Sequence, residues 1–131
     1  MVPQQSPFEA TSKVKAMTSA YAVIPFDGGG DAIPVGFLPK HLRILLSAIA
    51  NTPTGVTWYL SSDAAGDLPL TPATTTTILV GQSGATVGAV CVDLTTLLPL
   101  SLAAGIWIWA KLAGGAAPTA SGEAHMVGVR S

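Results

Sequence analysis

The stretch GVTWYLSSD, residues 55–63, decides the fold class of this chain. It is a run of β-branched and aromatic residues that ends at small and acidic ones, as a strand leading into a turn does. Comparable runs recur at 19–26, 74–81, 85–94, 105–112 and 123–131. Short β-prone runs separated by Gly, Pro, Asp and Thr predict strands and not helices.

The segment LPKHLRILLSAIANTP, residues 38–53, fits two patterns. A helical face would hold Leu42, Leu45, Leu46 and Ile49, whereas strand alternation would hold Leu42, Ile44, Leu46 and Ala48. We expect a strand, because ANTPTG at 50–55 looks like a hairpin connection and not like a helix end with its glycine cap.

The whole pattern predicts one antiparallel β-sandwich or jelly roll of about seven to eight strands. The run EATSKVKAM, residues 9–17, is either an eighth strand or a docking arm. We therefore divide the chain into an extended N-terminal arm, residues 1–18, and a single sandwich domain, residues 19–131.

Composition points to a surface that meets other proteins. Hydrophobic residues make up 49% of the 131 residues and charged residues 10%, against about a quarter charged in an average soluble domain. Apolar surface of this kind usually marks interfaces. A net charge of −1 provides no basic surface for nucleic acid, and Pro or Gly interrupts the apolar stretches before the roughly 20 residues of a membrane helix. We expect neither nucleic acid nor a membrane as partner.

Asp63 and Asp67, in SSDAAGD, are the acidic pair that a site would use. A Ca²⁺ loop needs six to eight oxygen ligands, and the stretch offers two carboxylates. A glycosidase pair needs its carboxyls roughly 5 to 10 Å apart across a cleft. Asp and Gly are also ordinary turn residues, so we expect a bend without metal. The glycine-rich stretch at 26–36 lacks the G-K-[S/T] ending of a phosphate loop, so no cofactor is expected.

No catalytic triad is predicted. His41 and His125 stand beside apolar residues, and the single cysteine, Cys91, lies in GAVCVDL, where we expect a buried packing residue. Trp107 and Trp109 would share one face of a strand, with Ile106, Ile108 and Ala110 on the other. Three roles stay open for the tryptophans: packing in the core under an arm or loop, contact with a neighbouring subunit, or a platform for sugar rings.

The stretches VTWYLSSDAAGDLPLTP, TTTTILVGQSGATVGAVCVDL and GIWIWAKLAGGAAPTASGEAHMVGVR together resemble the small β-rich virion proteins of tailed bacteriophages, nearest to head decoration (cement) proteins. The resemblance covers residues 55–131. It implies a homo-oligomer, a dimer or trimer, that has no enzymatic activity, lies on the outer capsid surface and bridges major capsid protein subunits.

Within this resemblance, particular residues are expected at interfaces. Pro3, Pro7 and Phe8 of the arm would lie against the capsid protein. Trp107 and Trp109 would pack in the core or against a sister subunit, and the loop from Asp63 to Asp67 would be a turn near a lattice contact or facing solvent. A purely structural role also predicts a large subunit interface and no stable pocket.

Two rival functions remain. A phage tail or fibre component that binds a receptor or carbohydrate predicts exposed aromatic residues and a cleft. A small hydrolase predicts that His41 or His125 meets Asp63, Asp67 or Asp93 in a pocket.

Overall fold

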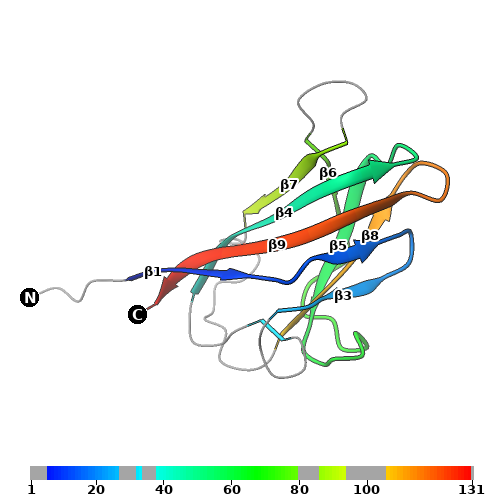
Figure 1. Cartoon of the computed structure of the whole chain (residues 1–131). Helices are drawn as coiled ribbons and strands as arrows, with labels where there is room; N and C mark the ends of the chain where they lie inside the picture. The colour runs from blue at the N-terminus through cyan, green and yellow to red at the C-terminus, as the bar shows by residue number, and fades with distance from the viewer. Residues whose placement is uncertain (1–5, 27–31, 34–37, 80–85, 94–105, 131) are drawn as a thin grey trace, which may run out of the picture.

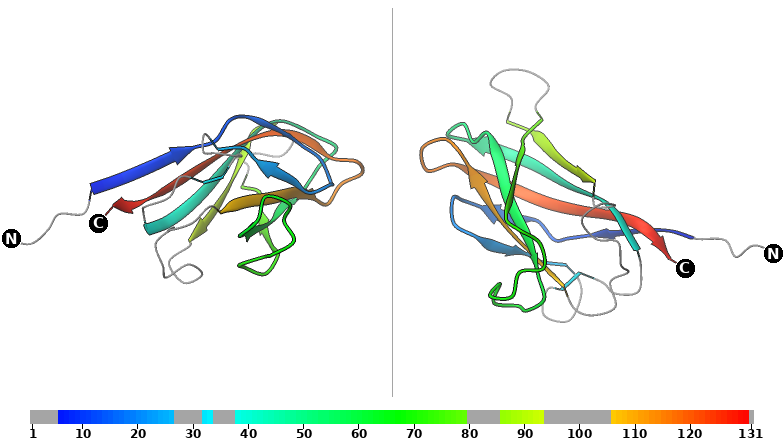
Figure 2. Two further views of the ribbon diagram at one scale, coloured as in Figure 1. Left: turned by 90° about the horizontal axis from the view of Figure 1, so that it is seen from below. Right: turned by 180° about the vertical axis from the view of Figure 1, so that it is seen from behind.

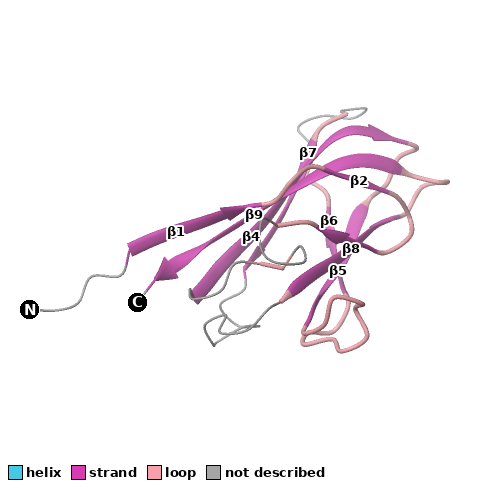
Figure 3. Ribbon diagram, turned by 60° about the horizontal axis from the view of Figure 1, so that its bottom comes forward, coloured by secondary structure: helices cyan, strands magenta, loops and turns pink. Residues whose placement is uncertain are grey.

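The chain folds into nine strands in the part that the structure, a computed structural model, describes: residues 6–26, 32–33, 38–79, 86–93 and 106–130. The strands are β1 (Ser6–Thr11), β2 (Lys15–Met17), β3 (Ala22–Ile24), β4 (Leu38–Ala50), β5 (Gly55–Ser61), β6 (Thr74–Thr77), β7 (Gly88–Asp93), β8 (Trp107–Ala113) and β9 (Thr119–Arg130). The described residues contain no helix (Figure 3), and thus none long and apolar enough to cross a membrane.

The strands form two antiparallel sheets (Figures 1 and 2). The larger sheet has the order β1-β9-β4-β7, with β2 also paired to β9, and the smaller has the order β3-β8-β5-β6. This confirms the all-β sandwich. β1 and β2 follow one another along β9 as one interrupted edge strand. The described residues thus form nine strands, where the sequence predicted about seven to eight.

The core fills the space between the sheets with alternate residues of each strand. In β8, Ile108, Ala110 and Leu112 are buried while their neighbours are half-buried. In β4, Leu42, Ile44 and Leu46 are buried in the same alternating way. The strand prediction for the ambiguous segment was therefore correct, because a period of two places one face of β4 in the core.

The connection at residues 50–55 is not the predicted hairpin. A hairpin would pair β4 with β5, but β4 pairs with β7 and β9, and β5 pairs with β6 and β8. The chain crosses between sheets here through Asn51 and Thr52, which have φ values of 64° and 53°. Asn51 Nδ2 donates a hydrogen bond to the Ala117 carbonyl (3.0 Å), which ties the crossing to the β8–β9 turn.

For residues 9–17 the sequence left two alternatives, a strand or a docking arm, and the structure shows strands. β1 and β2 pair with β9 of the same chain, with Thr11 opposite His125 and Ala16 opposite Ser121. Pro7 and Phe8 belong to β1, opposite Val129 and Gly128. Pro3 lies outside the described residues, and contact of this segment with another protein stays a prediction.

Candidate functional site

The loop between β5 and β6, residues 62–73, is closed by its own polar groups. Ser61 Oγ donates a hydrogen bond to Asp63 Oδ1 (2.6 Å), and the Leu68 N–H donates to the same oxygen (3.0 Å). The Ser61 hydrogen bond, more than the backbone bonds, lowers the pKa of Asp63. The Asp63 carboxylate thus stabilises the bend by accepting these hydrogen bonds, whereas the Asp67 side chain is exposed to solvent.

This loop, called here the leucine loop, lies over an aromatic pair on the outer face of the smaller sheet. The Tyr59 hydroxyl donates to the Gly66 carbonyl (3.0 Å). A Cβ added at Gly66 would lie 2.6 Å from the Tyr59 oxygen and 2.7 Å from Trp109 Cε2. Burial, followed by the charges of Tyr21, Asp67 and Asp63, raises the pKa of Tyr59. The indole N–H of Trp109 is buried and has no hydrogen-bond partner among the described residues.

The two tryptophans share one face of β8, as the alternation predicted, and the structure places that face opposite the core. Trp107 and Trp109 are half-buried, whereas Ile108 and Ala110 between and beside them are buried. Trp109 stands opposite Tyr59, under the leucine loop. Cover by a loop of the same chain was one of the alternatives for Trp109. Contact of either tryptophan with another subunit stays a prediction.

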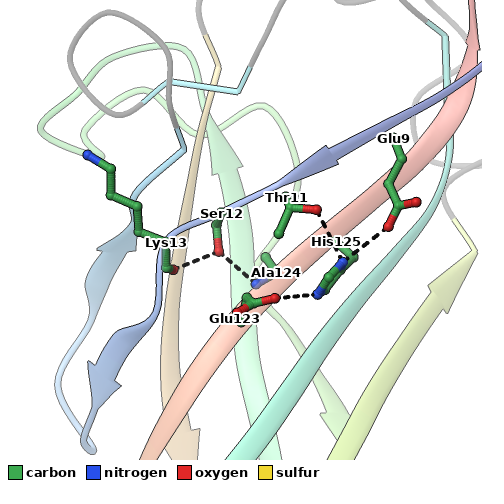
Figure 4. Close-up of polar contacts among 7 residues, drawn as sticks. All are labelled: Glu9, Thr11, Ser12, Lys13, Glu123, Ala124 and His125. Carbon is green, nitrogen blue, oxygen red and sulfur yellow. Dashed lines mark hydrogen bonds and ion pairs between the residues drawn. The ribbon is translucent and has the colours of Figure 1, made fainter.

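His125 links β1 to β9 on the outer face of the larger sheet (Figure 4). Its Nδ1 lies 3.2 Å from Glu9 Oε1 and 3.3 Å from Thr11 Oγ1, and its Nε2 lies 2.7 Å from Glu123 Oε1. The two carboxylates approach opposite ring nitrogens, so they do not converge on one point as metal ligands would. The described residues contain no group of three or more His, Cys, Asp or Glu side chains arranged to hold a metal ion.

A buried hydroxyl strengthens the same junction. Ser12 Oγ accepts the Ala124 N–H (2.7 Å) and donates to the Lys13 carbonyl (2.9 Å). The Ser12 N–H also donates to the Ala124 carbonyl (2.8 Å). The break between β1 and β2 is therefore hydrogen-bonded to β9, and residues 6–17 are part of the larger sheet.

Residues opposite each other on neighbouring strands share a face, and on the outer face of the larger sheet they form a charged half and a less charged half. The charged half consists of the rows Glu9–Val127–His41–Asp93 and Thr11–His125–Arg43–Cys91. The less charged half consists of the row Glu123–Leu45–Ala89–Leu79, which is mainly apolar, and the row Ala16–Ser121–Ser47, which carries two hydroxyl groups. Glu123 is the one charged residue in these two rows, and its carboxylate faces His125.

An open hollow of about 470 Å³ lies on the charged half. His41 and Asp93, opposite each other on β4 and β7, line it together with Cys91. The hydrolase hypothesis predicted that one histidine would share a pocket with Asp63, Asp67 or Asp93. His41 and Asp93 line this hollow together, whereas His125 lies between two glutamates. The prediction of a surface without any pocket was too simple.

The expectation that Cys91 is a buried packing residue was wrong. Cys91 is exposed on the outer face, opposite Arg43. Val90 and Val92 flank it on the inward face, where Val90 is buried and Val92 packs partly against the core. Because the residues on both sides of the cysteine are apolar, the sequence does not show which face of the strand Cys91 occupies. The pairing of β7 with β4 places Cys91 on the outer face.

The sequence-based predictions missed several exposed apolar residues. Leu68 and Leu70 are 61% and 50% exposed, and Val14 and Leu45 are 63% and 41% exposed. Leu68 and Leu70 alternate with prolines in LPLTP, outside any strand-like run. Leucines between prolines could have been recognised as exposed, because a segment of this kind forms no strand face that would bury them.

No protein-family model matches the chain, and no curated protein matches it either. Among solved structures, a chain of the cyanophage Pam1 capsid asymmetric unit is similar at 14% identity and a TM-score of 0.58, covering 100% of this chain and 92% of that one. A chain from Bacillus endospore appendages, described as a family of disulfide-linked pili, has 12% identity and a TM-score of 0.36, covering 98% and 93%. The first likeness shows a shared fold over the full length of this chain; the second is too low to support an argument.

Proposed function

We propose that this chain is a structural virion protein of a tailed bacteriophage. In this role it binds the outer surface of the capsid and stabilises the shell by bridging major capsid protein subunits, as a head decoration protein does. The observation that carries the proposal is the fold shared, over the whole chain, with a chain from a phage capsid asymmetric unit. The resemblance of residues 55–131 to small β-rich virion proteins agrees with it.

The surface supports the same role. Only 10% of the residues are charged, and exposed apolar residues include Leu45 on the larger sheet and Leu68 and Leu70 in the loop between β5 and β6. Burial of such side chains under a neighbouring protein favours association. A protein that binds only the assembled shell adds its binding free energy to the stability of that shell, and many symmetric weak contacts combine into strong attachment.

The role needs no catalysis, and we propose that the chain is not an enzyme. The hydrolase alternative depends on the hollow that His41, Cys91 and Asp93 line. We therefore expect the unmodified protein and the variants His41→Ala and Cys91→Ser to show the same background hydrolysis of ester and thioester substrates. Turnover by the unmodified protein that disappears in both variants would contradict this proposal.

The shell-binding experiment uses purified protein and phage shells that lack it. Sedimentation should show saturable binding, and the melting temperature of the shell should rise with the concentration of added protein. A chain lacking residues 1–5, which keeps β1 intact but loses Pro3, should bind more weakly if the N-terminal arm contacts the capsid protein. Absence of binding at saturating protein would rule out the decoration role.

Receptor or carbohydrate binding by a tail or fibre protein is the second candidate. Tyr21 is 37% exposed, its ring meets the Tyr59 ring edge to face at 5.2 Å, and Lys111 Nζ lies 4.6 Å from its centroid. A hollow of about 190 Å³ beside Tyr59 includes Pro69 and Pro72. Aromatic rings beside a hollow can stack on sugars. Glycan-array binding that Tyr21→Ala removes, without shell binding, would favour this function.

A further inference from the structure

We draw no further inference here: the strongest candidate, the apolar row Leu45–Ala89–Leu79, whose leucines are exposed on the outer face of the larger sheet, carries none because nothing in the described part of the structure shows what covers it.

Discussion

Replacing Gly66 by alanine tests whether the leucine loop is packed against the aromatic pair. Gly66 has a φ of +78°, and its added Cβ would lie 2.6 Å from the Tyr59 oxygen and 2.7 Å from Trp109 Cε2. An L-residue in this left-handed conformation costs about 1 to 2 kcal/mol. Forcing extra atoms into a packed contact costs about 1 to 3 kcal/mol more.

The expected loss is therefore about 2 to 4 kcal/mol, after subtracting the ~0.4 to 1 kcal/mol that Gly→Ala contributes through the unfolded chain. For a domain of this size, each kcal/mol corresponds to roughly 3 °C, so the melting temperature should fall by roughly 6 to 12 °C. If the loop instead detaches locally, the strain is relieved there and Trp109 becomes exposed to solvent.

Urea unfolding followed by tryptophan fluorescence, together with acrylamide quenching of the native state, measures both outcomes. Ala65→Ser is the matched control: Ala65 is the exposed neighbour of Gly66 in the same loop, and its variant should stay within about 0.5 kcal/mol. The reasoning is refuted if Gly66→Ala also stays within that range and its quenching is unchanged, because the loop would then not be packed on the indole.

Further predictions concern the core, the N-terminal junction and pH. Leu60→Ala should cost about 2 to 5 kcal/mol in urea unfolding because Leu60 is fully buried, while Leu68→Ala should cost less than about 0.5 kcal/mol. Ser12→Ala should cost about 1 to 3 kcal/mol, since it leaves a buried N–H of β9 unpaired; a change like that of Leu68→Ala would contradict this. The Ser61 hydrogen bond lowers the pKa of Asp63 below its ordinary 3.8, so its stabilisation is present above pH 3.8 and lost as pH falls through the lowered value. Asp63→Asn should flatten the loss of stability between pH 5 and pH 2, and an unchanged pH profile would show that Asp63 does not contribute.

The residue order by itself determined that this chain is an all-β sandwich. Runs of Val, Ile, Thr and Trp with a period of two, as in residues 55–61, place alternate side chains on opposite faces whatever the strand pairs with. The same local rule correctly predicted a strand at residues 38–50. It also placed Trp107 and Trp109 on one face and Ile108 and Ala110 on the other.

The tertiary structure decided which strands are neighbours and which faces are covered. Both faces of residues 105–112 are apolar, so periodicity could not choose the one that enters the core; packing between the sheets did. The turn chemistry at residues 50–55 is local, whereas the sheet switch there depends on the partners of β4 and β5. The contact between Glu9 and His125 joins residues 116 positions apart. Contacts of that range depend on how the whole chain buries its apolar surface, and no short stretch of sequence carries that information.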